Sequence, residues 1–304
     1  MAVCQGDGST DIYVFISFYK FEPAERSTDQ LTEQCILSRL PEELQSKFIS
    51  KLFIFDSLES TNITAKEMAL AGATHGTAVI ANYQTAGKGR GGKSFHSPSG
   101  SGIYMSSVLD TSVLGFSTPT LVTAHAAVCV CETIESLSSK VPQIKWVNDV
   151  FIGGKKVCGI LTEAVTARAV VRNTGGQFPS VIVGIGVNFV TPADGFPTEL
   201  QSIAGSVFGL DVPPVTREQF IAGLITRIAY PSDGFNENEM LDKYRQRMLL
   251  LDKRVLIRGS GMAESADSFE ATAIAVDDMG QLVIKKDSGE ILSLIAGDVS
   301  VAGY

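Results

Sequence analysis

The feature that most restricts what this chain can fold into is a glycine-rich loop with interspersed cations. Four glycines and three basic residues fill the seven positions from Gly87 to Lys93. Glycine lets backbone N–H groups approach an anion closely, and lysine and arginine supply the opposite charge. Thr77–Tyr83, directly before the loop, has the composition of a strand. The loop is therefore predicted to handle phosphate groups.

The same loop matches the P-loop pattern G-x-x-x-x-G-K-S from Gly87 to Ser94. A P-loop requires a helix that opens at its end, because the helix N-terminus helps to hold the phosphates. Phe95–Gly102 instead contains one proline and two glycines, which is typical of turns. The sequence favours an irregular phosphate loop over a P-loop, and a merely polar surface loop is the other alternative.

Composition limits the class of protein. The 304 residues are 44% hydrophobic and 19% charged, which predicts a large globular domain with a smaller companion. The net charge of −8 argues against a general nucleic-acid binder. Five scattered cysteines without a C-x-x-C pair favour a reducing compartment, no zinc site and buried thiols. We find no segment long enough to span a bilayer and no good signal peptide, so we expect a cytoplasmic protein without membrane association.

Strands and helices alternate through most of the chain. The predicted helices are Ile63–Ala71, Ser117–Ser138, Arg217–Ile228 and Asn236–Leu250. The predicted strands, besides Thr77–Tyr83, are Asp11–Phe21, Lys51–Asp56, Gly102–Leu109, Gln143–Ile152, Lys155–Glu163 and Ser180–Phe189, with a hairpin extension at Ala167–Gly176. Before the first of these helices, the polar turn Ser60-Thr61-Asn62 either caps the helix or holds a small polar ligand.

The turn Gly153-Gly154 predicts a two-residue hairpin that brings polar residues together. Lys145, Trp146, Asn148 and Asp149 precede the turn and Lys156 follows it. A polar cluster in an apolar hairpin is either functional or a structural ion pair, such as Asp149 with Lys156.

The glycines of the next strand have a different meaning. Gly184-x-Gly186 lacks the third glycine and the helix of a dinucleotide fingerprint. These glycines predict that a ligand or backbone approaches the strand closely. From Leu251 onwards, short strands separated by Asp- and Gly-containing turns predict a small all-β barrel. We divide the chain into an N-terminal extension (1–50), a catalytic domain (51–250) and this barrel (251–304).

Taken jointly, these stretches resemble the biotin–protein ligase family from Lys51 to the C-terminus. The motifs that carry the resemblance are Ser60-Thr61-Asn62, Gln84-x-x-Gly87-Lys88-Gly89-Arg90, Lys145-Trp146-Val147-Asn148-Asp149, Lys156 to Leu161 and Gly184-x-Gly186-x-Asn188. The resemblance implies an α+β fold. It consists of a mixed-sheet catalytic domain of the class II aminoacyl-tRNA synthetase and biotin ligase kind, followed by a small SH3-like β-barrel.

The resemblance also implies a reaction and a set of site residues. Biotin and ATP would give biotinyl-5′-AMP, and biotin would pass to a lysine of a biotin carboxyl carrier protein. Mg²⁺ would travel with the ATP phosphates, without metal ligands on the protein. The implied catalytic residues are Lys156, Arg90 and Asp149. The implied biotin-binding residues are Ser60, Thr61, Asn62, Gln84, Gly87, Lys88, Gly89, Arg90, Lys156 and Gly159. The implied nucleotide-binding residues are Lys88, Arg90, Phe95, Asn148 and Asn188.

Two positions depart from the family pattern, and alternatives stay open. Lys88 replaces the usual arginine and loses the planar fork, and Val147 replaces a proline with its fixed φ. A lipoate or octanoate ligase or transferase on the same fold is the nearest alternative, and a biotin-binding regulator is another. Residues 1–50 show no clear helix-turn-helix pattern, so we expect the form without a DNA-binding domain and no nucleic-acid partner. A homodimer is left open.

Overall fold

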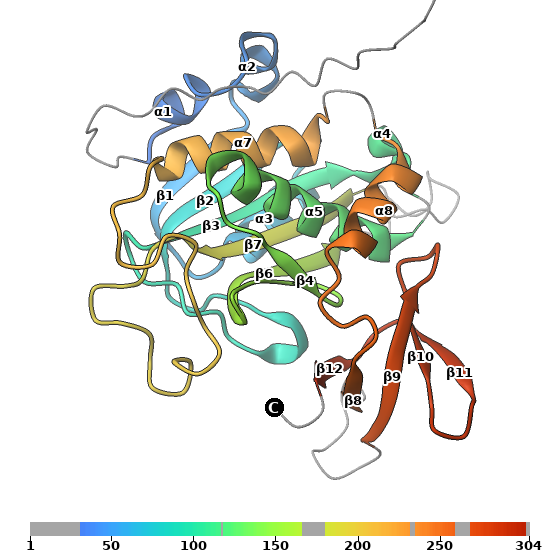
Figure 1. Ribbon diagram of the computed structural model, residues 1–304. Helices are drawn as coiled ribbons and strands as arrows, with labels where there is room; N and C mark the ends of the chain where they lie inside the picture. The colour runs from blue at the N-terminus through green and yellow to red at the C-terminus, as the bar shows by residue number, and fades with distance from the viewer. Residues whose placement is uncertain (1–30, 117, 166–179, 232–234, 259–267, 302–304) are drawn as a thin grey trace, which may run out of the picture.

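A mixed seven-stranded sheet forms the centre of the computed structural model, which describes residues 31–116, 118–165, 180–231, 235–258 and 268–301 (Figure 1). The strand order is β1-β2-β3-β7-β6-β5-β4. Only β1 and β2 are parallel among these neighbours, so the predicted α+β class with a mixed sheet is confirmed. The strands are β1 Leu52–Leu58, β2 Ala78–Gln84, β3 Gly102–Asp110, β4 Gln143–Lys145, β5 Asp149–Ile152, β6 Lys155–Ala164 and β7 Ser180–Asn188.

Helices cover both faces of this sheet (Figure 1). On one face α5 and α7 pack against each other and against the central strands, and on the other face α3 packs on β2, β3 and β7. Because both faces are covered, β3 is buried along nearly its whole length. The described helices of four residues or more are α1 Glu33–Leu37, α2 Glu42–Phe48, α3 Thr61–Leu70, α4 Thr111–Leu114, α5 Pro119–Leu137, α7 Arg217–Ala229 and α8 Glu237–Gln246.

The C-terminal strands form a separate five-stranded antiparallel sheet of order β11-β10-β9-β8-β12. It lies at one end of the molecule, next to α8 (Figure 1). Its inward-facing residues, among them Val255, Ile257 and Leu282, belong to the same continuous apolar core as the main sheet. The predicted short strands are confirmed as β8 Arg254–Arg258, β9 Phe269–Val276, β10 Leu282–Lys285, β11 Ile291–Leu294 and β12 Asp298–Val301.

Helix α5 corrects one expectation from the sequence. Thr120–Leu137 is long and apolar enough to cross a membrane by length and composition, although we expected no such segment. In the fold, 78% of this window is buried. Its apolar length is thus accounted for by packing in the core, between the sheet, α7 and α8.

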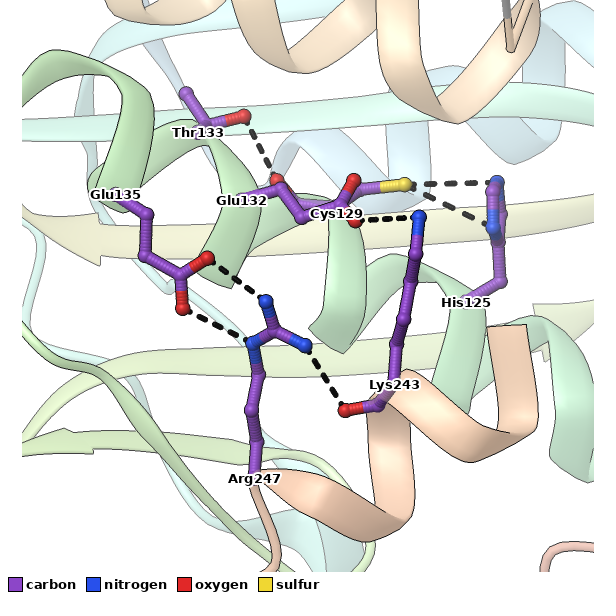
Figure 2. A network of polar contacts seen from close by, with 7 residues as sticks. All are labelled: His125, Cys129, Glu132, Thr133, Glu135, Lys243 and Arg247. Carbon is purple, nitrogen blue, oxygen red and sulfur yellow. Dashed lines mark hydrogen bonds and ion pairs between the residues drawn. The ribbon is translucent and has the colours of Figure 1, made fainter. Parts of the chain in front are cut away.

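A polar network fastens α8 onto α5 (Figure 2). Lys243 Nζ lies 2.8 Å from Glu132 Oε1. Arg247 donates to both carboxylate oxygens of Glu135, at 3.0 and 2.7 Å. A paired guanidinium–carboxylate contact of this kind fixes orientation as well as distance. The network therefore holds α8 in one orientation at the end of the main sheet.

The other contacts of α8 reach the C-terminal sheet and the sheet edge. Arg245 donates to the Val276 carbonyl at 2.9 Å and forms an ion pair with Asp278 at 2.7 Å. The buried Tyr244 hydroxyl donates to the Val147 carbonyl at 3.0 Å. Helix α8 thus ties the C-terminal sheet to the turn between β4 and β5.

Two predicted elements, the strand Asp11–Phe21 and the hairpin Ala167–Gly176, lie outside the described residues. The helix-compatible pieces before residue 50 appear as α1 and α2, with Pro41 at the start of α2. Their apolar residues Ile36, Leu40 and Phe48 join the main core.

Candidate active site

The polar turn before α3 faces the sheet instead of capping its own helix. Ser60 occupies the N-cap position with a φ of −157°, but its side chain makes no capping hydrogen bond. The N–H of Thr61 donates instead to Gln84 Oε1 at 2.9 Å. The expected side-chain cap was therefore wrong, because a side chain at the end of β2 satisfies this helix N-terminus.

A buried hydrogen-bond network surrounds this turn. Ser106 Oγ lies 2.8 Å from Thr61 Oγ1 and 2.6 Å from Asn62 Oδ1. Asn62 Nδ2 donates to Glu163 Oε2 at 2.8 Å. Thr61 and Asn62 are each 4% exposed, and Ser106 is fully buried. Buried amides and hydroxyls that are already held in place are suited to a small ligand with both donors and acceptors.

The glycine-rich loop adds its start to the same network. Gln84 Nε2 donates to Ser97 Oγ at 2.9 Å, and Ser97 Oγ donates to the Phe95 carbonyl at 2.9 Å. A Cβ atom at Gly87 would lie 2.5 Å from the Phe95 oxygen and 2.6 Å from Ser97 Oγ. Only glycine therefore fits at Gly87, because the returning end of the loop crosses it closely.

Glycines on β6 and β7 form a platform without side chains on the α3 face of the sheet. A Cβ at Gly184 would lie 1.8 Å from Asn62 Oδ1, and one at Gly186 would lie 2.5 Å from the Phe95 ring. Gly186 pairs with Gly159 across the two strands. The predicted close approach to this strand is confirmed, and the approaching groups are the side chains of Asn62 and Phe95.

Lys156 lies at the far end of the glycine platform. A Cβ at Gly159 would lie 3.4 Å from Lys156 Nζ and 3.3 Å from the Phe95 ring. Lys156 Nζ is 2.7 Å from Asp149 Oδ1, with side chains 30% and 20% exposed. The ion pair considered from the sequence is thus present. It lies beside the platform, so it does not exclude a functional role for either residue.

The glycine-rich loop folds back on itself and contains no α-helix. Phe95 N–H donates to the Gly87 carbonyl at 2.8 Å, and Gly89 N–H donates to the Lys93 carbonyl at 2.6 Å. A short 3₁₀ turn at Arg90–Gly92 reverses the chain, with Gly91 and Gly92 at φ of 66° and 77°. No helix follows in residues 93–101. The sequence argument against a P-loop is therefore confirmed.

The tip of the loop touches the C-terminal sheet. The Arg90 guanidinium donates to the Gly297 carbonyl. Lys93 Nζ lies 2.7 Å from Asp298 Oδ2, and this contact lowers the pKa of Asp298. Lys88 is exposed. Two of the three loop cations are thus held by residues from the far end of the chain.

The segment Gln143–Ile152 contains two strands rather than the single predicted one. Strands β4 and β5 pair antiparallel, with a tight turn at Trp146–Asn148. Trp146 Nε1 donates to the Gly280 carbonyl at 3.0 Å, and Asn148 Nδ2 donates to the Ile160 carbonyl at 2.8 Å. These partners are distant in sequence, which is why local composition predicted an uninterrupted strand.

The predicted nucleotide-binding residues are spread over the site. Arg90 and Asn148 line one cavity of about 220 Å³ with Thr123, Thr162 and Ile295. Phe95 covers the glycine platform and does not line that cavity.

Asn188 lies away from the cavity and supports Lys156. Asn188 Nδ2 donates to the Gly205 carbonyl at 2.9 Å, and Gly205 N–H donates to the Lys156 carbonyl at 2.9 Å. Asn188 thus holds the segment that flanks the backbone of Lys156.

Several site residues were missed by the sequence reasoning. Ser106 and Glu163 complete the network around Asn62, and Asp298 binds the loop. A serine inside the apolar strand Gly102–Leu109 was a usable signal, because buried hydroxyls need partners. Asp298 had no local signal, since its role depends on how the C-terminal sheet docks.

Within the described ranges, no cluster of three or more His, Cys, Asp or Glu side chains could hold a metal ion. Three of the described cysteines, Cys129, Cys131 and Cys158, are buried as free thiols. Burial raises the pKa of each thiol, so all three remain protonated at neutral pH. The prediction that Cys129 and Cys131 are buried small hydrophobes is confirmed.

We expect Tyr244→Phe to lower the free energy of unfolding by about 1–2 kcal/mol, because the Val147 carbonyl would lose its buried partner. Urea denaturation followed by circular dichroism measures the change. Tyr83→Phe is the matched control, since Tyr83 is 40% exposed and should change stability little. Equal effects of the two substitutions would contradict a specific role for the Tyr244 hydroxyl.

Comparison with known proteins places this site in context. The model of the biotin/lipoate A/B protein ligase family matches residues 54–188. The bifunctional ligase/repressor BirA of Bacillus spizizenii is 35% identical over 81% of this chain and 72% of its own length. The biotin--[acetyl-CoA-carboxylase] ligase of Mycobacterium tuberculosis is 30% identical over 79% of this chain and 85% of its own length.

The fold is also similar to solved structures. The biotin protein ligase from Aquifex aeolicus in complex with biotin and ATP matches with a TM-score of 0.66. The match covers 83% of this chain and 99% of that one, at 23% sequence identity. At this identity the similarity shows a shared fold.

Proposed function

The chain belongs to the biotin/lipoate A/B protein ligase family, and we propose that it uses ATP to attach biotin to a lysine of a biotin carboxyl carrier domain. The reaction passes through biotinyl-5′-AMP. The observation that supports this most is the line from Asn62 over Gly184 and Gly186 to Lys156. Alternate residues of a strand lie about 7 Å apart, so this line suits a short acid with a polar head group.

The head group of biotin would occupy the buried polar end of the platform. Asn62, Thr61 and Gln84 offer amide and hydroxyl groups that match a ureido ring, with Ser60 beside them and Gly87 closing the loop. Asn62 and Gln84 are 4% and 9% exposed, so a ligand hydrogen-bonded to them would be largely removed from water. A lipoyl chain has no such polar ring and would leave these groups without partners.

The carboxylate end of biotin would lie at Lys156, beside Gly159. A carboxylate that attacks the α-phosphate brings two anions together, and a fixed cation between them lowers the barrier. The attacking carboxylate oxygen bonds to the α-phosphorus, and pyrophosphate leaves with the electron pair of the broken bond. Arg90, Lys88 and the amides around Gly89 would shield the mixed anhydride from water. Phe95, Asn148 and Asn188 would contact or support the nucleotide side.

Asp149 would act in the second step. The acceptor lysine amine attacks the carbonyl carbon of the anhydride, AMP departs, and the amine loses a proton. Asp149, paired with Lys156 at 2.7 Å, is placed to orient the amine and to receive that proton. Mg²⁺ would arrive on the ATP phosphates, because Asp149 and the described residues near it form no metal cage.

Several further properties are part of the proposal. The C-terminal five-stranded sheet would be the SH3-like barrel of the family, and residues 51–250 its catalytic domain after an extension of residues 1–50. We place the protein in the cytoplasm, with a carboxylase carrier domain as partner and with homodimerisation open. The repressor activity in the name of the Bacillus relative is not included, because the sequence predicts no nucleic-acid partner.

ATP–pyrophosphate exchange with the purified chain tests the proposal. Exchange that depends on biotin is the expected result, and a carrier domain should then accept biotin on one lysine. Exchange with lipoate but not biotin would assign the chain to the lipoate branch of the family. A folded chain that exchanges with neither acid would reduce the proposal to ligand binding, as in a regulator.

We expect Arg90→Gly to release the adenylate and to label lysines on bystander proteins. The guanidinium lines the cavity and fastens the loop to Gly297, so its loss opens the loop over the adenylate. Labelling of added serum albumin, detected with streptavidin, should rise by about tenfold or more if protection from water is mainly due to the loop. Arg39→Gly, at an exposed arginine, is the control. No rise above the parent enzyme would rule out the protective role.

A further inference from the structure

A cluster of charged side chains lies where the glycine-rich loop meets the C-terminal sheet. Lys93 contacts Asp298 at 2.7 Å, and Arg90 donates to the carbonyl of the residue before Asp298. The charges of Lys145 and Arg90 also act on Asp298. A single carboxylate from the C-terminal sheet therefore faces three cations of the catalytic domain.

Lys145 connects this cluster to Lys156. It interacts electrostatically with Asp149 and Asp298, and with the like charges of Lys156 and Lys93. Burial lowers the pKa of Lys145, and its ammonium forms no ion pair with any residue in the described parts of the chain. A half-buried cation without a direct partner is costly unless an anion compensates for it.

The balance of charge in this region favours a polyanion. Four cations, Arg90, Lys93, Lys145 and Lys156, face two carboxylates, Asp149 and Asp298. Asp149 is committed to Lys156 on the sheet side. The positive excess thus lies between Lys156 and the C-terminal sheet, beyond the proposed position of the α-phosphate.

We propose that Lys93 and Lys145 bind the terminal phosphates of ATP and the departing pyrophosphate, and that Asp298 is an internal counter-anion that these phosphates replace. This inference rests on the proposed function, since it extends the same site. The C-terminal sheet would then set nucleotide affinity through one carboxylate. The residues of this subsite, Lys93, Lys145 and Asp298, come from the loop, β4 and β12.

The chemistry of adenylation explains why cations are needed at this position. When the bond between the α-phosphorus and its bridging oxygen breaks, the electron pair leaves with pyrophosphate. The negative charge of the leaving group therefore grows during the step. Ammonium groups at fixed positions stabilise that charge most where water is partly excluded. Lys145, being half-buried, meets this condition better than the exposed Lys93.

Isothermal titration calorimetry of the full chain with inorganic pyrophosphate tests the inference. Asp298→Asn should tighten pyrophosphate binding about threefold, the size expected for one exposed ion pair. Lys93→Gln and Lys145→Gln should each weaken it by about three- to tenfold. The gain from Asp298→Asn should shrink in the Lys93→Gln background, because the two residues contact each other. It should also shrink at high salt.

Asp287→Asn is the matched control. Asp287 belongs to the same C-terminal part of the chain and pairs with Arg254 at 2.6 Å, away from the loop. It removes the same charge, so an equal gain in affinity would show a general charge effect and overturn the inference. Weaker or unchanged pyrophosphate binding by Asp298→Asn would also overturn it, because Asp298 would then only support the loop.

The readout separates this inference from the proposed function. Pyrophosphate binding is measured without turnover, whereas the proposed function is tested by biotin-dependent exchange. If the parent chain shows no exchange, the proposed function fails while the ranking of the variants can still be scored. If exchange is normal and the ranking is absent, only the subsite assignment fails. Circular dichroism of each variant confirms that these surface changes leave the fold intact.

Discussion

Replacing Lys156 with alanine is expected to abolish biotin-dependent ATP–pyrophosphate exchange while the protein still folds. The rate should fall by about 10²–10³-fold or more, because a fixed charge that acts on the reacting groups contributes on this scale. The Lys156 side chain is 30% exposed, so its loss removes little packing. Asp149 loses its partner, but the nearby charge of Lys145 compensates in part.

The exchange assay needs three comparisons to assign this loss to chemistry. Biotin binding measured by calorimetry should persist, since the head group interacts with the far end of the platform. Lys155→Ala is the matched control: Lys155 Nζ bonds to the Gln201 and Ser202 carbonyls at 3.1 and 2.6 Å, away from the platform. Lys156→Arg should recover only part of the rate, because a planar fork replaces a compact ammonium. Normal adenylate formation by Lys156→Ala would remove this lysine from the mechanism.

The parts of the fold that local chemistry controls were predictable from the sequence. Gly153-Gly154 specified the β5–β6 hairpin, and both glycines have the positive φ that such a turn needs. The strand before the glycine-rich loop and the missing helix after it were also correct. In these segments a few adjacent residues determine the backbone, so no distant contact is required for the prediction.

The parts that failed depend on partners far away in the sequence. The turn at Trp146–Asn148 is fixed by Gly280 and Tyr244, which no local pattern connects to it. The expected cap at Ser60 was replaced by Gln84 from a neighbouring strand. Site residues quoted from family motifs converge in part, around Asn62 and Lys156. Their supporting residues, Ser106 and Asp298 among them, became visible only in the fold.

The glycine platform yields the second large prediction: Gly184→Ala should weaken biotin binding by at least about 100-fold. The added methyl would lie 1.8 Å from Asn62 Oδ1, so the amide must move. Moving it breaks contacts to Ser106 at 2.6 Å and Glu163 at 2.8 Å. Lost hydrogen bonds between buried groups cost about 1–3 kcal/mol each, which supports an effect of this size.

Comparison with Gly186→Ala makes this prediction specific. There the methyl would meet the Phe95 ring at 2.5 Å, but Phe95 belongs to a surface loop that can shift. We therefore expect Gly186→Ala to weaken biotin binding less than Gly184→Ala and to leave the free energy of unfolding nearly unchanged. Gly184→Ala should also lower that free energy by about 1–3 kcal/mol, the cost of overpacking. Asn62→Ala in the Gly184→Ala background should restore stability by relieving the clash, without restoring biotin affinity. If the double variant regains biotin affinity, Asn62 does not hold the head group, and the ligand must occupy another part of the platform.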